Sequence, residues 1–234
     1  MKIVYLFILT LAMSLQTSFG QDSRVRTLTA VGRGEIQTAP DLVVLNLELS
    51  AKNMDFNKAI EELNKKAAAL EKQVVAAGFK KEDLKTTSYT VNKNYEYHNG
   101  RSVDSGFIAH HAYTLEFPNE QTKIVAVVKA ISKGIEVSYN FGFTLSDAKK
   151  KEVKAELLKR AVKEATEEAN VLAAASGVKL KQINEITYGL SEIVPVAMAN
   201  VRMAKMSAES DFAGFEAKDI SLSEKVTITW ELAQ

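Results

Sequence analysis

The sequence predicts an α+β fold in which helices pack on the apolar face of antiparallel sheet. Several segments alternate apolar and polar residues, as expected for strands with one buried face. An Asn99-Gly100 turn signal between two of these segments indicates a hairpin. Other segments carry apolar residues at spacings of three and four, which is typical of helices that pack on a core.

The predicted order of elements is β-β-α-β-β-α-β-α-β-β, within one domain over residues 21–234. The expected strands cover residues 25–37, 43–51, 87–97, 107–117, 137–145, 180–188 and 220–232. The expected helices cover about residues 53–77, 124–131 and 146–176. Gly78 and Gly177 stand where left-handed C-caps belong. Residues 191–217 are expected to form a long loop, and such loops usually carry function or are disordered.

Gly32-Arg33-Gly34 raises the question of a phosphate-binding loop. A dinucleotide site needs a third glycine and then a helix, but the third position is Gln37, and Pro40 and a second alternating segment follow. Gly32 and Gly34 also lie on the same strand face as the neighbouring apolar residues. We therefore expect packing glycines in a strand, with Pro40 in the turn to the next strand.

The first twenty residues are typical of a secretory signal peptide. Lys2 is followed by an apolar run over residues 3–13, and Ser18 and Gly20 provide small residues before Gln21. The run is shorter than the ~20 apolar residues that a membrane span requires, so we expect no transmembrane helix in the mature chain. The predicted location is the periplasm, with secretion or surface association as alternatives.

Charge and cysteine content narrow the classes of partner. The chain has 30 Lys and Arg against 29 Asp and Glu, and loss of Lys2 with the signal peptide leaves 29 of each. A neutral mature chain argues against nucleic acid or anionic lipid as the main partner. The chain has no cysteine, which excludes a lipoprotein anchor and any disulfide.

Six segments together resemble the SIMPL-domain family of bacterial envelope proteins, over essentially the whole mature chain. They are VGRGEIQTAPDLVVLNLELSA, KKEDLKTTSYTVNKNYEY, GFIAHHAYTLEF, GIEVSYNFGFTLSD, AVKEATEEANVLAAASGVKLKQINEITYG and EAKDISLSEKVTITWEL. The chain departs from the family pattern at residues 217–220, where Ala-Lys-Asp-Ile replaces the usual Pro-Gly-Glu-Ile.

The resemblance implies an exported α+β protein. Some family members are associated with oxidative-stress tolerance and with ring-like homo-oligomers. The family has no established catalytic residues, so none is transferred to this chain. We therefore expect a non-enzymatic envelope protein without a cofactor, which supports envelope integrity or stress tolerance through homo-oligomers or an envelope partner.

The histidines and serines of the sequence predict neither a catalytic site nor a zinc site. His110 and His111 are adjacent in a strand and point to opposite faces, which predicts a surface His110 and a partly buried His111. His98 could share the polar face with His110, but zinc needs three or four convergent ligands. The sequence has no G-x-S-x-G nucleophile motif.

Met198, Met203 and Met206 lie in the expected long loop. Thioethers suit Cu(I) and can be oxidised reversibly, so one hypothesis is a Cu(I)-binding or oxidant-scavenging protein. The preferred interpretation is an apolar loop that packs on a neighbouring subunit, because methionine adapts to irregular surfaces and the loop offers no histidine or cysteine as a further ligand.

Cleavage of the signal peptide is expected after Gly20, because Ser18 and Gly20 fit the small-residue requirement of signal peptidase. Intact-mass spectrometry of the exported protein should therefore give a chain that begins at Gln21. A mass that still includes Met1 would contradict the prediction.

Overall fold

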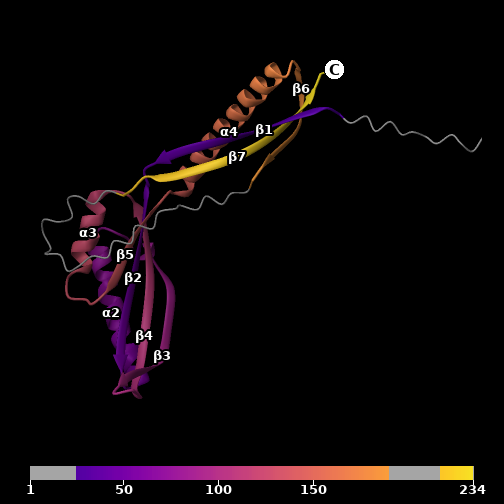
Figure 1. Cartoon of the computed structure of the whole chain (residues 1–234). Coiled ribbons are helices and arrows are strands. Elements are labelled where there is room, and N and C mark those ends of the chain that lie inside the picture. The colour runs from indigo at the N-terminus through magenta and orange to yellow at the C-terminus, as the bar shows by residue number, and fades with distance from the viewer. Residues whose placement is uncertain (1–24, 190–216, 234) are drawn as a thin grey trace, which may run out of the picture.

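The computed structural model describes residues 25–189 and 217–233, and it has an α+β fold built on two antiparallel sheets (Figure 1). The order of elements matches the sequence prediction, with one added 3-10 turn, η1. The strands are β1 (Thr27–Thr38), β2 (Leu42–Asn53), β3 (Leu84–His98), β4 (Arg101–Pro118), β5 (Ser138–Thr144), β6 (Leu180–Tyr188) and β7 (Ile220–Leu232). The helical segments are α2 (Phe56–Ala76), η1 (Lys81–Asp83), α3 (Gln121–Ile131) and α4 (Asp147–Ala175).

Each sheet and the helices that pack on it are called a layer below. The smaller layer consists of a three-stranded sheet in the order β1-β7-β6, with α4 along one face (Figure 1). β1 pairs with β7 along its whole length, from Thr27 opposite Glu231 to Thr38 opposite Ile220. The core of this layer combines apolar strand residues with a row of alanines on α4, spaced by four: Ala161, Ala165 and Ala169. These small side chains bring the helix close to the sheet.

The larger layer consists of a four-stranded sheet in the order β3-β4-β2-β5, with α2 and α3 on one face (Figure 1). Its core lies between this face and the helices, and every second residue of β2 from Val43 to Ala51 is buried there. On α2, the buried residues recur at spacings of three and four: Ala59, Leu63, Ala67, Leu70 and Val74. The sequence periodicities of two and 3.6 therefore predict the buried faces correctly.

Two details differ from the sequence prediction. First, the sheet is divided in two: β1 and β2 are joined through Ala39, Pro40 and Asp41 but belong to different sheets. Second, the expected loop before Gly106 is strand, because β3 and β4 continue to pair up to His98 opposite Arg101. The turn is confined to Asn99 and Gly100, both with positive φ.

The bounds of the helices also differ in part from the sequence prediction. α2 begins at Phe56 rather than near residue 53, because the Asp55 side chain accepts a hydrogen bond from the Lys58 N–H and caps the helix. Ser146 caps α4 in the same way, as the sequence predicts, by accepting from the Lys149 N–H. Phe56 and Leu172 also fit the apolar spacing in the sequence, but they are 44% and 41% exposed. The buried row of α4 runs through Ala169 and Ala173 instead of Leu172.

The backbone of α4 lies directly on Gly32 and Gly34 of β1. A Cβ atom at Gly32 would lie 1.9 Å from the Ala161 carbonyl oxygen, and one at Gly34 would lie 2.1 Å from that of Leu157. Neither position has space for any side chain. Only glycine at these two positions lets a helix rest on a strand at this separation.

A single methyl group at this contact should destabilise the fold. Gly34→Ala should lower the free energy of unfolding by about 1–3 kcal/mol or more, because the helix backbone must move to relieve the overlap. Gly142→Ala is the matched control, since its Cβ would have its nearest contact, the Val44 carbonyl oxygen, at 3.6 Å. Urea unfolding of both variants measures the difference, and equal stabilities would refute the close contact.

Candidate functional site

The strand β6 carries a row of three exposed apolar side chains, two of them aliphatic. Ile183, Ile186 and Tyr188 are 50%, 50% and 53% exposed. Their partners on β7, such as Ile228 opposite Ile186, are buried under α4. α4 lies over β1 and β7 and scarcely reaches β6. Among residues 25–189 and 217–233, no element therefore covers the helix-facing side of β6, and exposed apolar surface of this kind often marks an interface.

The opposite edge of the same sheet is closed by side chains of α4. The Glu164 carboxylate accepts a hydrogen bond from the Arg33 N–H of β1. The Arg160 guanidinium donates to the Glu35 carbonyl oxygen at 3.0 Å. These two contacts satisfy backbone groups that a free edge would offer to another strand. The layer therefore has one protected edge at β1 and one edge at β6 with apolar side chains beside it.

His111 lies on the helix-facing side of the four-stranded sheet, in a chain of three hydrogen-bonded side chains. Its Nε2 lies 3.0 Å from the Thr86 Oγ1, and its Nδ1 lies 2.7 Å from the Tyr113 hydroxyl. Tyr113 is only 3% exposed, and His111 is the sole hydrogen-bond partner of its hydroxyl within the described residues. A buried phenol must donate its hydrogen.

We therefore assign the Tyr113 hydroxyl as donor to Nδ1, which leaves the proton of the neutral ring on Nε2. Nε2 then donates to Thr86. A general base for a threonine nucleophile would have to accept the proton at that position. The triad of Thr86, His111 and Tyr113 consequently has the wrong proton arrangement for nucleophilic catalysis.

Burial shifts the acidity of both rings. Partial burial lowers the pKa of His111 below its ordinary 6.5, although the charge of Glu71 acts in the opposite direction. Burial, with the charges of Glu71 and Tyr89, raises the pKa of Tyr113 to about 12. His111 is therefore neutral and Tyr113 protonated at neutral pH, which agrees with the assigned hydrogen bonds.

His110 points to the other face of the same sheet, as the sequence predicts. Its Nδ1 lies 2.9 Å from the Glu48 carboxylate, and the His110 side chain is 34% exposed. Beside this pair lies an open hollow of about 410 Å³, lined mostly by amide and hydroxyl side chains, among them those of Asn46 and Asn140. The side chain of Glu48, which borders the hollow, is 56% exposed and paired with His110.

Glu224 is the buried charged residue of the described chain. It is 2% exposed, lies on the α4 side of β7 opposite Gly34, and its Oε1 has no hydrogen-bond partner among the described residues. Burying one polar oxygen without a hydrogen bond costs free energy of folding.

No group of three or more His, Cys, Asp or Glu in residues 25–189 and 217–233 is arranged to hold a metal ion. Met198, Met203 and Met206 lie outside the described residues, as does the side chain of His98. The described helices include none that is long and apolar enough to cross a membrane. The copper hypothesis thus rests on the sequence alone.

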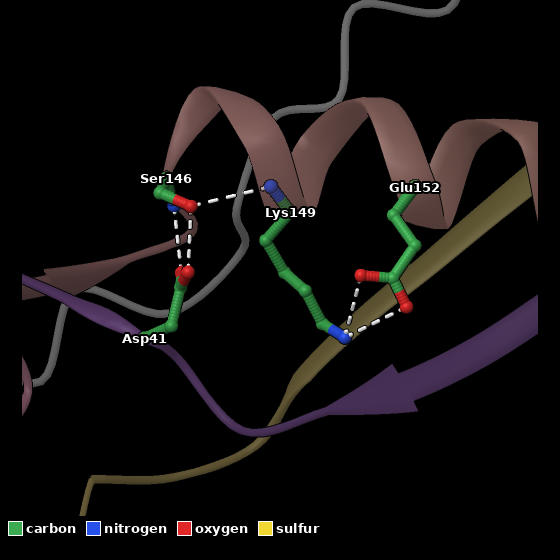
Figure 2. A network of polar contacts seen from close by, with 4 residues as sticks. All are labelled: Asp41, Ser146, Lys149 and Glu152. Atoms are coloured by element: carbon green, nitrogen blue, oxygen red, sulfur yellow. Dashed lines mark hydrogen bonds and ion pairs between the residues drawn. The ribbon is translucent and has the colours of Figure 1, made fainter.

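A polar contact connects the two layers at their junction, and sequence reasoning did not find it. Asp41, which follows Pro40, binds the N-cap residue of α4 (Figure 2): its carboxylate accepts from the Ser146 N–H at 2.7 Å and from the Ser146 hydroxyl at 2.6 Å. Burial alone would raise the pKa of Asp41, but the hydrogen bonds from Ser146 outweigh this effect and lower it below 3.8. The carboxylate is therefore ionised at neutral pH.

Comparison with known proteins completes the description. Residues 28–230 match the SIMPL family model, described as proteins of unknown function (DUF541). The chain belongs to the SIMPL family. The matched region includes both layers and both edges described above. The resemblance expected from the six sequence segments is confirmed.

Two curated relatives are similar to this SIMPL chain over most of their length. Each is a 26 kDa periplasmic immunogenic protein, one from Brucella melitensis biotype 1 and one from Brucella abortus strain S19. Each is 23% identical over 225 residues, which cover 92% of this chain and 90% of the relative.

The lowered pKa of His111 makes the stability of this SIMPL chain depend on pH. Between the ordinary pKa of 6.5 and the lower folded value, the unfolded chain binds more protons than the folded one. Stability should therefore fall as the pH decreases through this window. Urea unfolding between about pH 7.5 and 5.5 should show this slope. Most carboxyl groups titrate below this pH range and therefore contribute little to the slope.

The variant His111→Gln should flatten the slope, whereas His110→Gln, on the opposite face, should retain it. A wild-type stability that stays constant over this range, or a slope that persists in His111→Gln, would contradict the assignment.

Proposed function

We propose that the mature chain acts in the periplasm as a non-enzymatic envelope protein that works by self-assembly or by binding an envelope partner. The biological role of such an assembly would be support of envelope integrity or of tolerance to oxidants. The observation that carries the proposal is the uncovered row of Ile183, Ile186 and Tyr188 on β6.

The two edges of the three-stranded sheet support this choice of surface. Arg160 and Glu164 close the β1 edge, so strand addition there would require breaking existing hydrogen bonds. At β6, by contrast, an incoming apolar surface covers half-exposed isoleucines and a tyrosine without breaking such contacts. Tyrosine is enriched at protein interfaces because it combines apolar area with a polar tip.

The names of the relatives and the signal-like N-terminus support the location. Both relatives are named periplasmic, and they extend over 92% of this chain. The polar clusters support a role without catalysis. The His111 triad directs a proton toward Thr86, and the Asp41 carboxylate is occupied by Ser146. In these two clusters, therefore, the side chains stabilise the fold and do not form a nucleophile and base pair.

The experiment is a mass measurement of mature protein, residues 21–234, by analytical ultracentrifugation over a range of concentrations. We expect an assembly larger than the 25.7 kDa full-length chain. The double variant Ile183→Asp and Ile186→Asp should dissociate it, because charges replace the apolar contact. Val171→Asp is the control, since Val171 is 67% exposed on α4 and lies off the proposed surface.

A second variant separates the copper hypothesis from the preferred one. Replacing Met198, Met203 and Met206 together by Ser should weaken the assembly if these residues pack on a neighbour. The copper hypothesis instead predicts saturable Cu(I) binding that this variant abolishes, with an unchanged mass. A monomer at all concentrations that also fails to retain envelope proteins in a pull-down would refute the proposed function.

A further inference from the structure

In the part of the chain that the structure describes, the backbone crosses between the two layers at two points. It leaves the three-stranded layer after β1, through Ala39 and Pro40, and returns to it between β5 and α4, through Leu145 and Ser146. Within the described residues, no strand of one sheet pairs with a strand of the other. The relative orientation of the two layers therefore depends on these crossings and on the contacts between them.

The apolar contact at the junction is small. Leu145 is buried in a cluster with Val153 and Leu157 of α4 and with the first apolar residues of β7. It belongs to the second crossing itself, and the extensive core of the four-stranded layer is a separate cluster. No described element of one layer packs extensively on an element of the other. Such an arrangement is typical of domains that move relative to each other.

Asp41 joins the two crossings. Both oxygens of its carboxylate accept hydrogen bonds from Ser146, one from the backbone N–H and one from the hydroxyl. Asn119, between β4 and α3, holds the same turn: its backbone N–H donates to the Asp41 carbonyl oxygen and its side-chain Nδ2 donates to that of Pro40. Each contact is 2.6–2.9 Å long.

The polar network continues from Ser146 into α4, as Figure 2 shows. The Ser146 hydroxyl oxygen accepts from the Lys149 N–H, and the Lys149 Nζ contacts both carboxylate oxygens of Glu152 at 3.1 Å. The same serine therefore caps the helix and receives Asp41. This arrangement fixes the first turn of α4 against the β1–β2 crossing.

We propose that the Asp41–Ser146 contact is a conformational latch that fixes the angle between the two layers, and that breaking it lets them hinge at Pro40 and Leu145. The latch is bidentate and charge-assisted, so it holds one geometry. Asp41 lies on the surface, where water competes for its carboxylate, so opening does not require unfolding of either core. Hinges of this kind are a few residues at the ends of elements.

Electron spin resonance can measure the angle through distances between spin labels. The chain has no cysteine, so two introduced cysteines give unique labelling sites. The pair Lys72→Cys on α2 and Lys159→Cys on α4 measures the distance between the layers, because both residues are exposed and lie in different layers. The pair Lys72→Cys and Asn92→Cys, both within the four-stranded layer, reports whether that layer stays intact.

The test variant is Asp41→Asn, which keeps the shape of the side chain but removes its charge and one acceptor. The matched control is Asp147→Asn, which removes a charge from the first turn of the same helix without contacting Asp41. We expect a single narrow distance distribution between layers in the parent and in Asp147→Asn. In Asp41→Asn, this distribution should shift and broaden, while the distances within the layer stay the same.

Two results would overturn the proposal. An unchanged distribution between layers in Asp41→Asn would show that other contacts set the angle. Equal broadening within the layer would show that Asp41 serves the stability of the fold instead of a hinge. Asp41→Ala, which removes both acceptors, should broaden the distribution between layers further.

Discussion

The arrangement of the three-stranded layer depends on the contact between the α4 backbone and Gly32 and Gly34. Because no side chain separates them, the helix lies closest to β1 and extends over β7, so it is displaced toward the β1 edge of the sheet. From that position Arg160 and Glu164 reach the outer edge of β1. The same displacement leaves β6 without a covering helix among the described elements. One steric constraint thus determines which edge is closed and which apolar surface is open.

Much of the fold could be predicted from the sequence because its signals are local. Alternation in β7, from Ile220 to Trp230, predicts its buried face at every apolar position, and the buried Glu224 is the exception. Ser146 and Gly177 mark the ends of α4 by cap chemistry. The division into two sheets could not be predicted in this way. A turn at Pro40 is equally compatible with a hairpin and with a crossing to another sheet, since strand pairing is a non-local property.

The candidate site was harder to predict for the same reason. The opposite faces of His110 and His111 follow from strand geometry, but the contacts of His111 with Thr86 and Tyr113 depend on the register of β3 and β4. Asp41 is an ordinary surface residue in the sequence, and its role arises only when Ser146, more than a hundred positions later, lies beside it. The exposure of Ile186 likewise depends on the position of α4 and not on the β6 sequence.

The path of the chain through the two layers has a consequence for the order of folding. The four-stranded layer is one uninterrupted stretch of chain, from Leu42 to Thr144, and its strands β3 and β4 form a hairpin. The three-stranded layer joins distant parts of the chain: Thr29 meets Thr229 across 200 positions. Closing so long a loop is entropically costly and slow unless the intervening chain is already compact. This topology predicts that the inserted layer forms before the three-stranded layer and that pairing of β1 with β7 completes the fold.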